Sequence, residues 1–349
     1  MMMNNRLVEC VPNFSEGRDM GVIRQITDAI ESVEGVSVLH VDAGEAANRT
    51  VVTFVGSPEN IVEAAFRAVK KAGEAIDMRK HHGTHPRIGA TDVLPLIPVS
   101  GITLEECAEL ARGLAKRIAN EAGIPCYCYE AAAFRPEFKN LAVCRAGEYE
   151  GLPEKLADPE RRPDFMPEAM FNVQWSMVNG QCSMFNESVA RTGCSVVGAR
   201  DFLIAVNFNL NTTDTHIANA IAFDVREKGR PPKPGTLKCT KALGWYIDEY
   251  GIAQVSMNIT NINVTSLHVA FEEVCRCAAL RGVKVTGTEI IGLVPKRTLI
   301  EAGRYFLEKQ HLSPDLPEED ILKTAITSMG LDDLKPFDPQ KKVIEYLID

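Results

Sequence analysis

The sequence predicts an α+β protein with two ferredoxin-like α/β subdomains, each a mixed sheet with helices mainly on one face. Two observations lead to this fold class. Short β-branched runs alternate with segments whose apolar residues recur every three or four positions, and each half of the chain repeats the order βαββαβ. This order suits a ferredoxin-like sheet better than a doubly wound parallel sheet. A chain of 349 residues, 45% of them hydrophobic, can bury a core in each half.

The first half is expected to contain strands and helices in alternation. A capping-box pattern, Thr103-x-x-Glu106, marks the start of one helix. The expected elements are a strand at 7–11, a helix after Asp19, strands at 36–41 and 50–56, a helix from Pro58, a strand ending at Val99, a helix from Thr103 and a strand at 124–129.

The second half is expected to begin near Arg200, because residues 130–200 have weak periodicity and are predicted to be mostly loop. We therefore expect an N-terminal subdomain at 1–198, a C-terminal subdomain at 199–312 and a charged, helical appendage at 313–349. The expected elements of the second subdomain are a strand at 201–210, a helix to about Lys228, strands at 241–246 and 253–259, a helix at 264–278 and a strand at 283–286.

The composition excludes several classes of protein. Lys and Arg number 38 against 47 Asp and Glu, so the net charge of −9 disfavours a nonspecific nucleic-acid binder. An apolar stretch of signal-peptide length, or of the roughly 18 residues that a membrane span needs, is absent from the sequence. Ten cysteines in such a chain favour reduced thiols and a cytoplasmic protein.

The loop at 77–87 is the first candidate site, because it combines three of the seven histidines with Lys80 and Arg87 in an acidic protein. A histidine with a pKa near ~6.5 can transfer a proton at neutral pH, and cationic neighbours would attract an acidic small molecule. A solvated polar loop is the alternative. A metal site is not expected, because His81 and His82 are adjacent and the spacing supplies no fourth ligand.

Polar residues at predicted strand ends form a second group of candidates. Asp42 could orient a histidine from another loop, or it could bond within its own turn. Asn13, Arg49 and Arg200 each place a fixed donor beside a strand end, although such residues are often structural. Neither GxGxxG nor GxxxxGK[ST] occurs, so a nucleotide-binding fold has no support.

Several motifs, taken in order, resemble the glutamate formimidoyltransferase family. The similarity covers about residues 6–312. Its motifs are VECVPNFSEG (8–17), VDAG (41–44), NRT (48–50), KHxGxHPR (80–87), RAGEYE (145–150), PDF (163–165) and VGAR (197–200).

The resemblance implies transfer of a formimidoyl group from N-formimidoyl-glutamate to N5 of tetrahydrofolate, a step of histidine breakdown. Tetrahydrofolate, possibly polyglutamylated, would be the cosubstrate, and no metal is implied. The family's general base falls on His85, and the aspartate beside it falls on Asp42. A homodimer is also implied.

Both substrates carry carboxylates, which Arg side chains bind with two parallel hydrogen bonds. Arg49, Arg87, Arg145 and Arg200 are the candidates, with no basis for pairing each with one carboxylate. The full set of expected substrate- and folate-binding residues is Asn13, Arg49, Lys80, Arg87, Arg145, Pro167, Gly193 and Arg200. Many relatives continue into a cyclodeaminase domain, and this chain is expected to lack one.

The sequence departs from the family at the folate loop, where Met166-Pro167 replaces a glycine and a proline. Met170-Phe-Asn172 recurs as Met184-Phe-Asn186, which suggests an insertion at 172–185 that acts as a lid or as a subunit contact. Three alternatives remain open: formyl transfer between glutamate and folate, a noncatalytic folate-binding protein, and a metal-dependent hydrolase.

Overall fold

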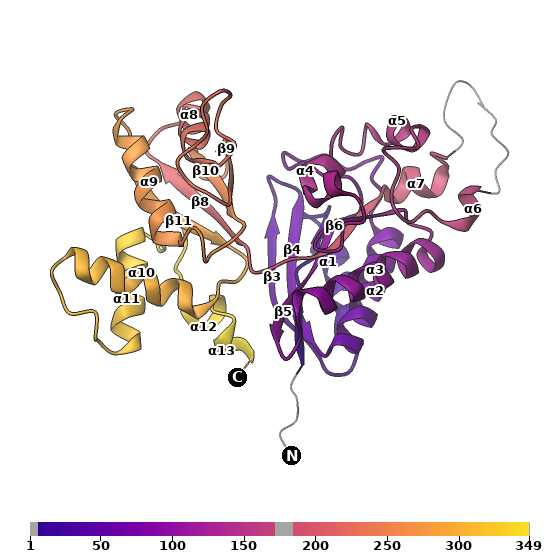
Figure 1. Ribbon diagram of the computed structural model, residues 1–349, viewed down its shortest axis with the longest axis horizontal. Helices are drawn as coiled ribbons and strands as arrows, with labels where there is room; N and C mark the ends of the chain where they lie inside the picture. The colour runs from indigo at the N-terminus through magenta and orange to yellow at the C-terminus, as the bar shows by residue number, and fades with distance from the viewer. Residues whose placement is uncertain (1–5, 172–183, 349) are drawn as a thin grey trace, which may run out of the picture. The chain divides into compact units, whose positions relative to one another are not determined.

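The computed structural model describes residues 6–171 and 184–348 and divides into two compact units, residues 1–200 and 201–349 (Figure 1). The unit boundary lies two residues from the expected subdomain boundary. Within the described residues, every helix is too short or too polar to cross a membrane.

Unit 1 is built around a seven-stranded mixed sheet of order β3-β4-(β1, β2)-β5-β7-β6. The short strands β1 and β2 share one place and pair antiparallel with both β4 and β5, whereas β7 pairs parallel with β5 and β6. Its main elements are β1 (Leu7–Cys10), β2 (Asn13–Phe14), α1 (Met20–Glu31), β3 (Val36–Gly44), β4 (Arg49–Gly56), α2 (Pro58–Ala75), β5 (Thr91–Ser100), α3 (Leu104–Arg117) with its π-helical extension η1 (Ile118–Ala122), β6 (Cys126–Glu130) and β7 (Ser195–Ala199).

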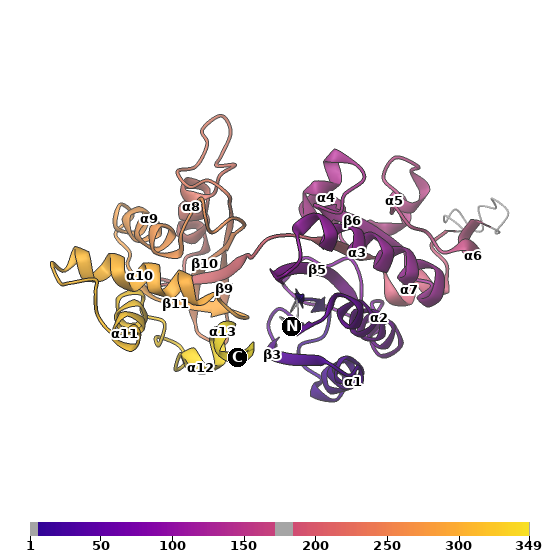
Figure 2. The ribbon, with the colours of Figure 1, turned by 60° about the horizontal axis from the view of Figure 1, so that its bottom comes forward.

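The three long helices of unit 1 begin at side-chain caps that the sequence supplies. Asp19 accepts from two backbone N–H groups of α1, Ser57 caps α2 ahead of Pro58, and Thr103 forms the expected capping box. Helices α1, α2 and α3 lie side by side against the sheet (Figures 1 and 2). This confirms a mixed sheet with helices mainly on one face.

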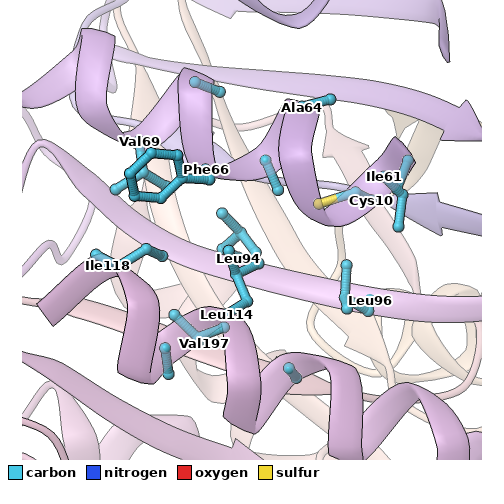
Figure 3. Close-up of a cluster of buried hydrophobic side chains, with 14 of the residues drawn as sticks. Cys10, Ile61, Ala64, Phe66, Val69, Leu94, Leu96, Leu114, Ile118 and Val197 are labelled. Atoms are coloured by element: carbon cyan, nitrogen blue, oxygen red, sulfur yellow. The ribbon is translucent and has the colours of Figure 1, made fainter. Parts of the chain in front are cut away.

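The core of unit 1 lies between these helices and the sheet (Figure 3). Leu94 and Leu96 of β5 meet Ile61 and Val69 of α2 and Leu114 of α3, all fully buried. Each such side chain contributes roughly 1.5–3 kcal/mol by leaving water. This packing fixes β5 and therefore the loop that precedes it.

The segment 130–200, expected to be mostly loop, contains short helices and β7. These elements have four to six residues each, too few for an apolar period of 3.6 to repeat, which is why the sequence pattern missed them. The helices are η2 (Pro136–Lys139), α4 (Leu141–Cys144), α5 (Leu152–Ala157), α6 (Glu168–Phe171) and α7 (Glu187–Thr192). Most of the expected insertion, residues 172–183, lies outside the described residues.

Unit 2 has a four-stranded sheet of order β11-β8-β10-β9, with helices α8 and α9 packed on it (Figure 1). The βαββαβ chain order and this strand order are ferredoxin-like, as expected. The strand pairings are antiparallel, however, so this sheet is not mixed. Its elements are β8 (Ile204–Leu210), α8 (Thr215–Val225), β9 (Thr240–Ile247), β10 (Ile252–Ile259), α9 (Leu267–Ala279) and β11 (Val285–Ile291).

The C-terminal segment that the sequence set apart as an appendage is helical and shares the core of unit 2. Leu322, Ala325 and Met329 of α11 and Val343 belong to the same buried cluster as Phe208 of β8. The apolar face of α11 packs against α10, which explains why this segment belongs to unit 2. The helices are α10 (Lys296–Lys309), α11 (Glu318–Met329), α12 (Pro339–Lys342) and α13 (Glu345–Ile348).

Candidate active site

One edge of the unit 1 sheet gathers most of the polar residues that the sequence singled out. Asn13 begins β2, Arg49 begins β4, and Asp92 is the second residue of β5. Because β4 and β5 are both antiparallel to the β1–β2 strand, their first residues and the end of that strand lie at the same edge. The histidine loop leads directly into β5 and reaches this edge as well.

The Asp92 cluster, formed by Asn13, Arg49, Asp92 and Arg145, occupies this edge. Oδ2 of the fully buried Asp92 accepts from Arg49 Nη1 at 2.6 Å and from Arg145 Nη2. Oδ1 accepts from Arg145 Nε at 3.1 Å and from the backbone N of Ile88 at 3.0 Å. Arg49 Nε also donates to Asn13 Oδ1 at 2.9 Å.

The Asp92 cluster carries an excess of positive charge, because two guanidinium groups share one carboxylate. Burial alone would raise the pKa of Asp92, but Arg145 and Arg49 hold it well below its usual range. Burial lowers the pKa of Arg49 to about 10, so this guanidinium is still protonated at neutral pH. The cluster therefore suits an anionic ligand group.

His85 lies near the Asp92 cluster and is held neutral. Its pKa is lowered to about 3, first by burial and then by the charges of Arg49 and Arg145. Its Nδ1 is 2.7 Å from the carbonyl oxygen of Pro86. A carbonyl oxygen only accepts, so Nδ1 carries the proton and Nε2 is the basic nitrogen.

His81, in the same loop, has a structural environment. Its buried ring has Nε2 2.8 Å from the carbonyl oxygen of Asn48, while Nδ1 accepts from Arg87 Nε at 3.3 Å. Arg87 in turn holds Glu150 with two bonds, at 2.6 and 2.8 Å, and Glu148 at 3.1 Å. The fork of Arg87 therefore pairs with carboxylates of the chain, and its expected contact with a substrate carboxylate stays a prediction.

Gly193 supports the loop by allowing close backbone contact. It has a positive φ of 67°, and a Cβ there would lie 2.3 Å from the carbonyl oxygen of Ile88. The neighbouring Cys194 N donates to the same carbonyl at 3.1 Å, and Ala90 N donates to Thr192 O at 2.8 Å. Glycine is thus required at this position whether or not it contacts a ligand.

Two other expected site residues, Asp42 and Arg200, lie at different places on the unit 1 sheet. Asp42 on β3 and Asn13 on β2 both pair with Val51 of β4, so they project from the same sheet face. Nδ1 of His85 lies against Pro86 O, and the expected role of Asp42 in orienting His85 stays a prediction. Arg200 follows the far end of β7 and bonds to Tyr129.

Lys80 is exposed in a turn, with its backbone N bonded to Asp77 O. Pro167 is buried and accepts, through its carbonyl oxygen, from Met170 N at 2.9 Å at the start of α6. The described contacts do not bring either residue into the Asp92 cluster. Their expected folate contacts stay predictions.

Sequence reasoning missed Asp92, Glu148 and Glu150 as partners of the arginines. Asp92 had a usable signal, because a carboxylate inside an otherwise apolar strand is almost never buried without a cationic partner. The two glutamates lie within the RAGEYE motif, and only its arginine was singled out. In residues 6–171 and 184–348, three or more His, Cys, Asp or Glu side chains nowhere gather as a metal ion would require.

Comparison with known proteins gives the same family over both units. The model of the N-terminal subdomain of the formiminotransferase domain matches residues 7–180, and that of the formiminotransferase domain matches residues 205–349. The chain is 42% identical to a glutamate formimidoyltransferase of Streptococcus pyogenes serotype M1, covering 87% of this chain and 94% of that protein.

A second relative is longer than this chain. The formimidoyltransferase-cyclodeaminase of Sus scrofa is 45% identical over 345 residues, which are 99% of this chain and 60% of that protein. The chain therefore spans about 60% of the length of such relatives. Since both family models and these relatives cover nearly all of it, the chain belongs to the formiminotransferase family.

Proposed function

We propose that the chain is a glutamate formimidoyltransferase that moves the formimidoyl group of N-formimidoyl-glutamate to N5 of tetrahydrofolate. The observation that carries this proposal is a neutral His85, with an unprotonated Nε2 that can accept a proton, near a cluster with one excess positive charge. The family supports the same reaction, because its named members include glutamate formimidoyltransferases.

The Asp92 cluster is the proposed site for a donor carboxylate. Arg49 and Arg145 each use part of their guanidinium on Asp92 and keep further N–H groups for a ligand. Charge-assisted bonds of this kind are short and strong in a partly desolvated site. Arg87 takes the role of supporting the loop, because Glu148 and Glu150 already occupy it.

His85 transfers the proton in two steps. N5 of tetrahydrofolate attacks the amidine carbon and gains positive charge as the new C–N bond forms. Nε2 of His85 accepts the N5 proton, and the imidazolium then protonates the glutamate nitrogen, so that its bond to the carbon breaks and glutamate leaves as a neutral amine. Such general acid–base catalysis contributes about 10² to 10⁴ in rate.

The donor itself adjusts this base. A pKa of about 3 makes His85 a weak base in the free protein. Burial is the first cause of this low pKa, and the charges of Arg49 and Arg145 come next. A donor carboxylate beside the two arginines offsets their charge and so raises the pKa of His85. Proton transfer is then most effective when the donor is bound.

The remaining functional expectations belong to this proposal. Tetrahydrofolate, free or polyglutamylated, is the cosubstrate, and Pro167 and Arg200 are candidates for contacting it. Cytoplasmic histidine degradation is the proposed setting and a homodimer the proposed assembly, with subdomains at 1–198 and 199–312. Light scattering at micromolar concentration tests the dimer, because a monomeric mass would contradict it.

The decisive experiment is a transfer assay with purified protein, tetrahydrofolate and either N-formimidoyl- or N-formyl-glutamate, followed by the absorbance of the folate product. We expect product from the formimidoyl donor. Product from the formyl donor alone would establish the sibling reaction, and binding without product from either donor would indicate a folate-binding protein. Activity that is lost on chelation would point to a metal-dependent enzyme.

A further inference from the structure

Asp92 differs from an ordinary buried ion-pair partner in what it connects. Its side chain is fully buried, and each carboxylate oxygen accepts two hydrogen bonds. The donors come from three separate segments: the first residue of β4, the residue that caps α4, and the backbone that precedes β5. One carboxylate therefore joins both arginines to the loop that bears His85.

The two arginines would not hold these positions by themselves. Arg49 and Arg145 repel each other, as the lowering of the Arg49 pKa by Arg145 indicates. Asp92 lies between them and offsets this repulsion. It accepts from Arg145 through Nε and Nη2 together, which fixes the plane of that guanidinium as well as its position.

Each guanidinium keeps part of its donor set for another ligand. Of its N–H groups, Arg49 uses Nε on Asn13 and one on Nη1 for Asp92. Arg145 uses Nε and one on Nη2, so its Nη1 is left. Both side chains are mostly buried, 9% and 14% exposed. A hydrogen bond from either guanidinium to a ligand therefore depends on how Asp92 orients that guanidinium.

We propose that Asp92 is a positioning residue that aims Arg49 and Arg145 at one carboxylate of the donor and so determines selectivity for acidic over amidated donors. This inference rests on the proposed function. Asp92 does not contact the substrate; it acts through the two arginines and through Ile88 N. Moving its carboxylate, even with its charge kept, therefore impairs recognition of the donor carboxylate.

The test compares N-formimidoyl-glutamate with its two monoamides, formimidoyl-glutamine and formimidoyl-isoglutamine. Wild type should prefer the diacid over at least one monoamide by about 10- to 100-fold in kcat/KM, the worth of a charge-assisted bond. In Asp92→Glu, which keeps the charge but displaces it, this ratio should fall to within a few-fold of one, while KM for tetrahydrofolate stays unchanged. Asp92→Asn should lose the same preference.

Glu63 provides the matched control. It also accepts from two arginines, Arg67 Nε and Arg117 Nη1, both at 2.7 Å, but on the half-exposed helical side of unit 1. Glu63→Gln should keep the wild-type preference for the diacid. Should an Asp92 variant fail to fold by circular dichroism, Arg145→Lys, which keeps the charge but loses the fork, gives the same readout.

Three results would overturn the inference. The first is an unchanged diacid preference in an Asp92 variant that folds, which would make Asp92 merely structural. The second is an equal loss in Glu63→Gln. The third is a wild type that transfers all donors equally, which would remove the carboxylate site while leaving the proposed reaction intact. A wild type that transfers from none of them would instead refute the proposed function.

Discussion

Each unit has a set of hydrogen-bonded polar side chains that joins three neighbouring strands of its sheet, but the side chains differ between the two units. In unit 1, Arg49 of β4 donates to Asn13 of β2 and to Asp92 of β5. In unit 2, Gln254 of β10 donates to Asn209 of β8 at 2.8 Å and to Glu289 of β11 at 3.4 Å. Strand order brings these positions together in both units.

The difference lies in charge. The unit 1 set has an excess cation and a neutral histidine beside it. In unit 2 the amide of Gln254 takes the place of the Arg49 guanidinium. Glu289 accepts from the neutral donors Asn207, Gln254 and Tyr250. The shared fold thus supplies the geometry, whereas residue identity gives the unit 1 set the excess positive charge and the nearby histidine on which the proposed anion binding and proton transfer depend.

Replacing His85 tests this assignment with the largest expected effect. His85→Ala should lower kcat by about 10² to 10⁴, because proton transfer is needed mainly in the transition state. The dissociation constant for 5-formyl-tetrahydrofolate should stay the same. His216→Ala, at the exposed start of α8 in unit 2, serves as the control. Full turnover in His85→Ala would remove this histidine from the mechanism.

The charge difference should also appear in stability. Asp92→Asn leaves two buried guanidinium groups without their counter-charge and should cost about 3–5 kcal/mol of unfolding free energy. Glu289→Gln loses bonds to neutral donors and should cost about 1 kcal/mol. Urea unfolding measures both. Equal losses would mean that the two sets are energetically alike.

Acid should destabilise the folded protein through the histidine loop. Burial is the first cause that lowers the pKa of His81 and of His85 below their ordinary value of about 6.5. Below that pH the unfolded chain binds more protons than the folded chain. The contribution of these two histidines to the free energy of unfolding is therefore fully present above about pH 6.5 and is lost as the pH falls. We expect Tm to drop by on the order of a few degrees between pH 7 and 5.

A nontitrating variant isolates the share of that loss due to His85. His85→Gln should show a shallower decline of Tm with pH than wild type. An identical decline in the two proteins would assign the acid sensitivity to other groups, such as His268 in unit 2, whose pKa burial also lowers.

The smallest expected effect is a change in the titration of His85. Arg145→Gln removes one of the charges that lower the His85 pKa, so that pKa should rise toward its ordinary value, although burial still holds it down. The proton NMR signal of the imidazole C2–H, followed against pH, measures this change. A shift to lower pH would show that Arg145 does not act on His85 electrostatically.

Much of the fold could be predicted because its signals are local. The capping box at Thr103 and the apolar period of α2 depend on neighbours in the chain, and both appear in the structure. The antiparallel sheet of unit 2 and the packing of α11 depend on distant partners, so local periodicity could not give them.

The site was predictable in its residue types and less so in its pairings. The motifs pointed to Arg49, Arg87 and Arg145, but which of them is available for an anion depends on Asp92, Glu148 and Glu150, far along the chain or on other elements. The sequence motifs therefore identified the cations, and only the fold showed that Arg87 pairs with Glu148 and Glu150 whereas Arg49 and Arg145 share Asp92.

The integration of α11 with α10 has a consequence for handling the protein. The connection from Leu312 to Pro317 is mostly exposed and lacks regular structure, so it is one of the described segments that proteases should cut. The released C-terminal peptide would stay bound, because Leu322, Ala325 and Met329 lie in the core of unit 2. A nicked sample would then run as one species under native conditions and as two fragments on a denaturing gel.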